Sequence, residues 1–256
     1  MNTRVNTDSK TGNAQPQRTN EHGQPFGPAL EAWTERARPS RTPMEGRYCR
    51  LEPVNAERHA AELYCAYMAA SDGRDWTYLF AERPDDPAAF RAYLDKAAAS
   101  NDPLHYTILE LPPAGGKGLA VGTAALMRIE PVLGVIEVGS ITYSPRLKQT
   151  RAGTEAMFLM MRRAFEELGY RRYEWKCDSL NAPSRAAAKR YGFEYEGLFR
   201  QAIVYKGRSR DTAWFAITDR EWPRVRTAFE GWLGPDNFDS DGRQKRSLSA
   251  IRESLA

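Results

Sequence analysis

The chain has 256 residues, with 37 Lys or Arg against 33 Asp or Glu and a formal charge of +4. A chain of this length can bury a core without disulfides or a metal, and so small a positive excess does not favour a nucleic-acid-binding protein. The three cysteines, Cys49, Cys65 and Cys177, form no C-x-x-C pair and no cluster with histidine, so we expect reduced thiols and no metal site. No apolar run reaches the roughly 18–20 residues of a membrane span, and the N-terminus lacks the apolar core of a signal peptide. The composition therefore predicts a cytoplasmic protein.

Polar composition sets off both ends of the chain. Residues 1–27 are rich in Asn, Gln, Thr and Gly and predict a disordered tail. Residues 28–45 contain three prolines and Trp33, which indicates an extended arm laid across the domain. Residues 46–233 alternate strand and helix patterns and form one domain, and residues 234–256 turn polar again, as in a C-terminal tail.

The first half of the domain predicts a strand, two helices and two further strands. Residues 47–51 alternate as a strand, Asn55 caps a helix through Met68, residues 90–99 form a second helix, and residues 105–111 and 119–129 form strands. The aromatic run Trp76 to Phe80 is either core packing or part of an acceptor pocket. The loop at 112–118 contains Gly-Lys, but it lacks the spacing of a phosphate-binding loop.

The second half has stronger patterns. Residues 135–143 predict a strand with Glu137, Ile141 and Tyr143 on one face, and residues 154–168 predict an amphipathic helix that ends at Gly169. Residues 173–177 form another strand, and Asn181 caps a short helix that Gly192 closes. Residues 199–205 and 212–217 form a hairpin. The apolar face of the last helix, 221–233, packs on its own domain or joins a homodimer.

The loop 148–153 runs directly into a predicted helix. Backbone N–H groups and the positive end of the helix dipole would then face outward together, with Arg146, Lys148 and Arg151 beside them. A pyrophosphate would fit this loop. The order of elements predicts an α/β or α+β domain with a mixed sheet.

Seven short motifs in this order resemble the GNAT acyl-CoA N-acyltransferases, in the branch of ribosomal-protein alanine N-acetyltransferases. They cover residues 46–218 and are Glu137-Val138-Gly139, Ser144-Pro145, the loop into Thr154-Glu155-Ala156, Ala164 to Gly169, Asn181-x-x-Ser184, Gly192-Phe193-x-x-Glu196-Gly197 and Arg210-Asp211-Thr212. The resemblance implies a central, mostly antiparallel, twisted sheet with splayed central strands, flanked by helices. It also implies that acetyl-CoA is the acyl donor and an amine the acceptor.

The resemblance places coenzyme A between the splayed strands and along the loop. The implied cofactor-binding residues are Ile141, Thr142, Tyr143, Lys148, Gln149, Thr150, Arg151, Ala152, Gly153, Thr154, Asn181 and Ser184. Two loop residues depart from the family pattern, because Lys148 replaces Gln or Arg and Arg151 replaces a glycine. An arginine in the left-handed conformation that glycine adopts would cost about 1–2 kcal/mol.

Catalysis needs a base for the acceptor amine and an acid for the leaving thiolate. Ala188 stands where many relatives carry a tyrosine, so Ser184 and Tyr191 are the candidate acids. Glu137, a carboxylate among apolar neighbours, is the candidate base, with a structural carboxylate as the alternative. Glu155 is expected to be a partner of the helix dipole.

A site with a weak base suits amines that are partly neutral at pH 7. An α-amine has a pKa of about 7.7–8.0, whereas a lysine amine lies near 10.4. We therefore expect acetyl transfer to a peptide or protein N-terminus or to a small amine. The alternatives are a non-catalytic acyl-CoA-binding scaffold, motivated by Arg151 and Ala188, and a ribosome- or RNA-associated module, motivated by the charge and tails.

Overall fold

The structure, a computed structural model, describes residues 18–255, which divide into two units between Thr34 and Glu35. In the first unit, β1 (Arg18–Thr19) and β2 (Pro25–Phe26) form a small antiparallel hairpin. The side-chain oxygen of Asn20 closes its turn by accepting hydrogen bonds from the backbone N–H groups of His22 and Gln24. Residues 18–26 of the expected tail thus form a hairpin, and residues 1–17 lie outside the described residues.

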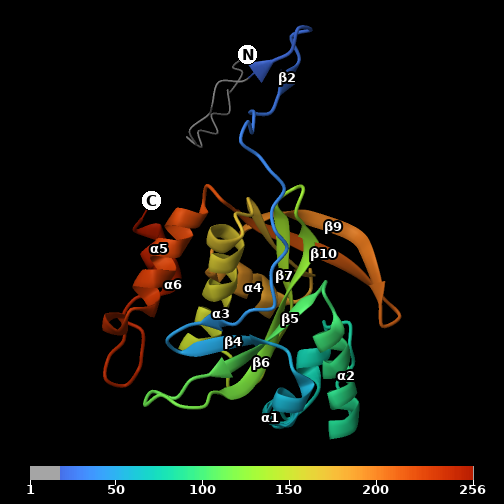
Figure 1. Ribbon diagram of the computed structural model, residues 1–256, viewed down its shortest axis with the longest axis vertical. Helices are drawn as coiled ribbons and strands as arrows, with labels where there is room; N and C mark the ends of the chain where they lie inside the picture. The colour runs from blue at the N-terminus through green and yellow to red at the C-terminus, as the bar shows by residue number, and fades with distance from the viewer. Residues whose placement is uncertain (1–17, 256) are drawn as a thin grey trace, which may run out of the picture. The chain divides into compact units, whose positions relative to one another are not determined.

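The second unit is built on an eight-stranded sheet in the order β3-β4-β5-β6-β7-β8-β10-β9 (Figure 1). Its pairs are antiparallel except for β7 and β8, which are parallel, so the predicted mixed, mostly antiparallel sheet is confirmed. The strands are β3 (Met44–Glu45), β4 (Cys49–Pro53), β5 (Leu104–Glu110), β6 (Leu119–Glu130), β7 (Val135–Tyr143), β8 (Arg172–Asp178), β9 (Glu194–Tyr205) and β10 (Arg208–Thr218).

Helices cover both faces of the sheet (Figure 1). A smaller apolar cluster lies between the sheet and α1 (Ala56–Met68) with α2 (Pro87–Ala99). The larger apolar cluster lies between the other face of the sheet and the helices α3 (Arg151–Arg162), α4 (Ala182–Arg190), α5 (Trp222–Leu233) and α6 (Leu248–Glu253). Among residues 18–255, no helix is both long enough and apolar enough to cross a membrane.

Helix α5 packs on its own domain, which answers the question left open by the sequence. Phe158 of α3 stacks against Trp222 and Phe229 of α5, with ring centroids 6.0 and 5.4 Å apart. The segment beyond Gly234 also departs from the expected polar tail. It contains α6, whose Leu248 and Ile251 are buried in the larger cluster.

Residues 35–45 of the expected arm are held to the second unit by side-chain hydrogen bonds. The guanidinium of Arg163 donates to the carbonyl oxygens of Thr42 and Pro43 at 2.7 and 2.9 Å. The phenol of Tyr106 donates to the carbonyl of Ser40. Residues 28–34 belong to the first unit, so the expected arm is divided between the two units.

Glu155 does not act as a partner of the helix dipole. It is buried in α3, and its carboxylate accepts hydrogen bonds from the backbone N–H groups of Arg47, Tyr48 and Cys49 at 2.9, 2.6 and 2.8 Å. These N–H groups belong to the turn between β3 and β4. Glu155 therefore ties that edge of the sheet to α3.

Candidate functional site

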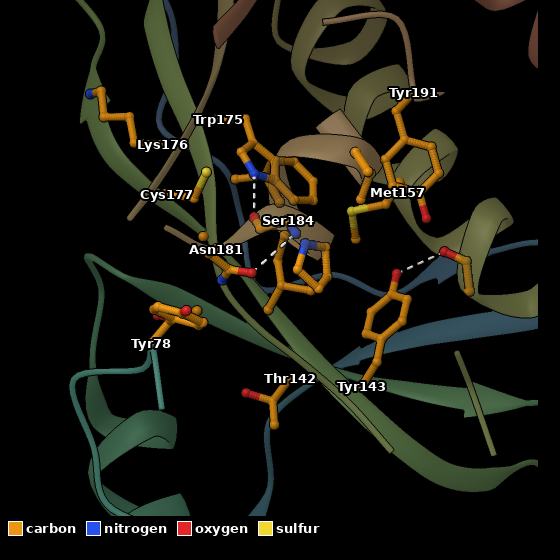
Figure 2. A pocket seen from close by; sticks show the side chains of 18 of the residues that line it. Tyr78, Thr142, Tyr143, Met157, Trp175, Lys176, Cys177, Asn181, Ser184 and Tyr191 are labelled. Atoms are coloured by element: carbon orange, nitrogen blue, oxygen red, sulfur yellow. Dashed lines mark hydrogen bonds between the residues drawn. The ribbon is translucent and has the colours of Figure 1, made fainter. Parts of the chain in front are cut away.

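The central strands β7 and β8, which form the parallel pair of the sheet, separate partway along their length. The parallel pairing of β7 with β8 runs from Val135 opposite Arg172 to Val138 opposite Trp175 and stops there, although both strands continue. The predicted splay is confirmed. A continuous cavity of about 1520 Å³ opens in the gap (Figure 2). Small-molecule sites usually have about 300–1,000 Å³, so this cavity can hold two reactants.

A β-bulge in β7 changes which side chains face this cavity. Ser140 has a φ of +48°, and the register with β6 shifts between Gly139 opposite Ala125 and Thr142 opposite Thr123. An extra residue reverses the alternation of the strand beyond it. The expectation that Glu137, Ile141 and Tyr143 share one face is therefore wrong, because the bulge lies between Glu137 and the other two.

The candidate pyrophosphate loop is a tight turn capped by its own side chains. Thr150 is the N-cap of α3, and its hydroxyl accepts from the N–H of Gly153 at 3.0 Å. The phenol of Tyr143 donates to the carbonyl of Gly153 at 2.7 Å. A Cβ on Gly153 would lie 2.7 Å from the carbonyl oxygen of Leu147, so this position requires glycine. Helix α3 begins at Arg151, three residues earlier than predicted.

The loop conformation removes the strain expected at Arg151. The residue with positive φ is Gln149, at +60°, whereas Arg151 already lies in the first turn of the helix. An arginine is compatible with that backbone. The substitution of the family's glycine therefore gives no reason, in backbone terms, to expect a disrupted loop.

The side chain of Arg151 contacts the C-terminal segment. Its guanidinium lies over the ring of Phe238, 4.0 Å from the centroid, and 3.5 Å from the carbonyl oxygen of Gly242. The indole N–H of Trp232 donates to the side chain of Gln244 at 2.7 Å. These contacts place Phe238 and residues 242–244 along the cavity wall beside the loop. Sequence analysis missed this wall, because the segment is polar and has no regular period.

The other basic loop residue also has a partner. The amine of Lys148 lies 2.5 Å from the carboxylate of Asp75, which belongs to the 3₁₀ turn Arg74–Trp76. Every expected cofactor-binding residue lines the cavity except Ala152, which is buried against the core instead.

Helix α4 begins on the opposite side of the cavity. Asn181 is its N-cap, and the side-chain oxygen of Asn181 accepts from the N–H of Ser184 at 3.1 Å. The Ser184 hydroxyl accepts a hydrogen bond from the indole N–H of Trp175 at 3.0 Å (Figure 2). Because the hydroxyl accepts from Trp175, its own hydrogen can point toward a ligand in the cavity.

Tyr191, the second candidate acid, also lines the cavity, at the far end of α4 (Figure 2). Burial raises the pKa of its phenol, and the nearby charge of Arg190 acts in the opposite direction. The phenol is therefore protonated at neutral pH. The tyrosine position common in relatives is occupied by Ala188, which is fully buried.

Glu137, the candidate base, lies between two cations. Its Oε2 is 3.0 Å from the amine of Lys176 and 3.0 Å from the guanidinium of Arg128. Neither contact has the angles of a hydrogen bond, so both are electrostatic. Burial raises the pKa of Glu137, while Lys176 and Arg128 lower it. Burial is the larger effect, so the pKa of Glu137 is raised above its ordinary value, and the residue lines the cavity.

The aromatic run from Trp76 to Phe80, between α1 and α2, contributes both to the core and to the cavity. Trp76 is buried against Tyr67 and Tyr93 in the core below α1 and α2. Tyr78 and Phe80 instead line the cavity, and the Tyr78 phenol donates to the carbonyl of Leu180 at 3.2 Å. Opposite them, Phe199 stacks on Trp214 with centroids 4.3 Å apart.

Comparison with known proteins identifies relatives. The family model described as an acetyltransferase (GNAT) domain matches residues 49–194. A GCN5-related N-acetyltransferase from Brucella melitensis is 49% identical and superposes with a TM-score of 0.84, covering 88% of this chain and 100% of its own. A protein from Chromobacterium violaceum described as a probable acetyltransferase of this family is 38% identical, with a TM-score of 0.71, covering 78% of this chain and 98% of its own.

More distant structures share the fold alone. One is an acetyltransferase from Salmonella typhimurium described as modifying the N-terminal serine of a 50S ribosomal-subunit protein. It is 17% identical, with a TM-score of 0.57, and the match covers 69% of this chain and 99% of its own. None of the curated proteins compared with the chain matches it.

Proposed function

Since the chain belongs to the GNAT family of acetyltransferases, which implies an acyl-CoA donor, we propose that it transfers acetyl from acetyl-CoA directly to an α-amine or to a small amine of low pKa. The observation that carries this proposal is the single cavity that joins the loop before α3 to an aromatic and charged wall around Glu137. Donor and acceptor can then meet in one ternary complex, where their proximity replaces a bimolecular encounter.

The donor would lie along the side of the cavity formed by α3 and α4. The N–H groups of Arg151 and Ala152, at the start of α3, precede its first backbone hydrogen bond and can donate to the pyrophosphate, whereas that of Gly153 is used by the cap. The pantetheine arm would occupy the gap between β7 and β8, where the backbone of β7 beyond Val138 is not paired with β8. The side-chain amide of Asn181 can donate to that arm, since only its oxygen is used by the helix cap. The bound coenzyme supplies the activated thioester carbonyl.

The acceptor amine would approach from the side of Glu137. The carboxylate can accept a proton from an ammonium group, but Lys176 and Arg128 limit its basicity. A lysine amine, with a pKa near 10.4, would need a stronger base than an α-amine near 7.7–8.0. The charge environment of Glu137 thus favours α-amines and small amines of low pKa.

The test is release of free thiol from acetyl-CoA in the presence of matched amines. We expect turnover with N-terminal peptides or small α-amines, and at least tenfold lower kcat/KM for the same peptide acetylated at its N-terminus but bearing a free lysine. Tight donor binding without turnover above hydrolysis for any amine would favour the non-catalytic scaffold. Preferred transfer to lysine would refute the α-amine assignment.

Replacing Asn181 with alanine should weaken binding of acetyl-CoA about tenfold, because one hydrogen bond to the pantetheine arm is lost. Titration calorimetry measures this affinity. The matched control is Asn55→Ala, since Asn55 caps α1 through the same bond, to the N–H of Arg58 at 2.9 Å, away from the cavity. Both variants should lose about 1 kcal/mol of stability. Equal donor affinity in the two variants would show that Asn181 only caps its helix.

Replacing Glu137 with glutamine should lower kcat roughly tenfold. This effect is smaller than the usual contribution of a general base, because the two neighbouring cations limit the basicity of the carboxylate. In the parent protein kcat/KM should rise with pH as Glu137 loses its proton, and this limb should disappear in the variant. Glu174→Gln is the control, since Glu174 contacts the same Lys176 at 2.6 Å but does not line the cavity. Because the charge of Glu174 raises the pKa of Glu137, this variant should move the limb to lower pH without removing it. An unchanged pH profile in Glu137→Gln would exclude Glu137 as the base.

A further inference from the structure

Arg210 carries a buried guanidinium that forms no ion pair with a carboxylate of residues 18–255. It lies on β10, lines the cavity, and is 6% exposed. Among residues 18–255 its Nε has no hydrogen-bond partner, and its guanidinium takes part in no ion pair. Its contacts are with two rings, since the guanidinium carbon lies 5.8 Å from the centroid of Phe80 and 5.9 Å from that of Tyr205.

The carboxylates closest to Arg210 along the chain and the sheet are already engaged. Asp178 accepts a hydrogen bond from the phenol of Tyr205 at 2.8 Å and another from the N–H of Leu180 at 2.9 Å. Asp211 accepts from the backbone N–H of Gln201 at 2.7 Å. Neither carboxylate forms an ion pair or a hydrogen bond with Arg210 within residues 18–255, although Asp178 also lines the cavity.

A second donor lies two residues further along the same strand. Thr212 is buried, lines the cavity, and its hydroxyl has no hydrogen-bond partner within the described part of the chain. Residues two apart on a strand point to the same face. The register of β10 with β9 shifts between Arg210 and Thr212, but both residues are buried and line the cavity, so both belong to the wall formed by β10.

A buried charge or hydroxyl without a partner is unfavourable, and ring contacts only partly offset the lost hydration of a guanidinium. A carboxylate would satisfy both groups, because the planar guanidinium donates two parallel hydrogen bonds to its oxygens. We propose that Arg210 and Thr212 form a carboxylate-binding subsite, and that the acceptor is an amine that also carries a carboxylate, such as a short peptide with an acidic first residue. This inference rests on the proposed acetyl transfer to an amine.

The phosphates of the donor are less suited to this subsite. The candidate pyrophosphate loop precedes α3, and the wall around it comes from α4 and the C-terminal segment. Arg210 lies instead on the wall shared by Phe80, Trp214 and Ile203. The tip of the β9–β10 hairpin holds that wall in place, since Lys206 donates to the carbonyl of Trp76 at 2.8 Å. The subsite therefore belongs to the acceptor.

The first test compares peptides beginning with Glu and with Gln as acceptors, with rates expressed per concentration of neutral amine so that their different amine pKa values cancel. The expected kcat/KM is roughly 10- to 100-fold higher for the acid, the usual effect of a hydrogen bond to a charged group. A second pair, an amino acid and its carboxamide, tells whether an α-carboxylate can serve. A ratio near one in both pairs overturns the proposal, while turnover itself keeps the transferase assignment.

The second test changes the subsite. Arg210→Gln should bring the acid-to-amide ratio to within about threefold of one, and Arg210→Lys should restore part of it. The matched control is Arg208→Gln, because Arg208 lies over the ring of Tyr205 at 5.0 Å and donates to the carbonyl of Thr77, but does not line the cavity. Its ratio should equal that of the parent.

If Arg210 has only a structural role, Arg210→Gln should lower the melting temperature but leave the acid-to-amide ratio of the folded protein unchanged. This result would overturn the proposal. Should Arg210→Gln fail to fold, Thr212→Val removes the second donor without removing the charge. It should lower the acid-to-amide ratio about threefold or more. An unchanged ratio in Thr212→Val, together with a parent ratio near one, would also refute the subsite.

Discussion

Replacing Glu155 with alanine is expected to destabilise the protein by about 3–5 kcal/mol, as for other losses of a buried hydrogen-bonded charge. The carboxylate accepts three backbone hydrogen bonds, from the N–H groups of Arg47, Tyr48 and Cys49. Its removal leaves these donors with no acceptor beside α3. A shift of the urea midpoint measures the loss, with an unchanged slope if unfolding stays two-state.

The control for Glu155 is an acidic residue that makes no such contacts. Glu57 lies exposed in the first turn of α1, and Glu57→Ala should change stability by less than about 1 kcal/mol. Glu155→Gln should be intermediate, because the amide retains one oxygen but turns N–H donors toward the backbone N–H groups. A loss of under about 1 kcal/mol in Glu155→Ala would mean that water replaces the carboxylate.

Glu155 also shows what the sequence could predict and what it could not. Its place in a helix follows from local pattern, but α3 begins at Arg151, so Glu155 lies in the second turn and not in the expected first turn. Its partners lie 106–108 residues away along the chain, so no local pattern reports them. The same holds for the C-terminal segment, where Leu248 and Ile251 find a core that only the tertiary fold provides.

Strong periodicity was a sound guide to the elements that frame the cavity. The cap at Asn181 and the glycine at the end of α4 follow from residues within one element. The splay of β7 and β8 was instead implied by the family resemblance. The direction of side chains beyond Ser140 could not be predicted, because a serine rarely adopts a positive φ and nothing in the sequence marks a bulge there. One backbone angle thus decides which face Tyr143 occupies.

The backbone of the loop before α3 differs from the one that the family pattern implies. Aligning Arg151 with a glycine implied a left-handed residue, but the positive φ belongs to Gln149, and Arg151 opens the helix. A sequence motif fixes residue order without fixing the residue at which a helix begins. The side chain of Arg151 then becomes available to hold Phe238 beside the cavity.

Ser184→Ala is expected to lower kcat about 100-fold, the usual effect of removing one hydrogen-bond donor from a developing negative charge. The leaving thiolate would form near the N-terminus of α4, where the dipole favours an anion and Ser184 can donate its hydroxyl hydrogen. The indole N–H of Trp175, bonded to the same oxygen, orients the hydroxyl. Single-turnover acetyl transfer measures the step, and the affinity for acetyl-CoA should change by less than about threefold.

Two variants separate Ser184 from Tyr191 as the acid. Ser184→Thr keeps a hydroxyl and should recover most of the rate, whereas Tyr191→Phe should lower kcat by less than about threefold. Burial keeps the pKa of Tyr191 high, so a phenol acting as the acid would leave a marked deficit in Tyr191→Phe at every pH below that pKa. If Tyr191→Phe loses the larger share and Ser184→Ala keeps its rate, the proton comes from the phenol, and the hydroxyl of Ser184 serves only to anchor Trp175.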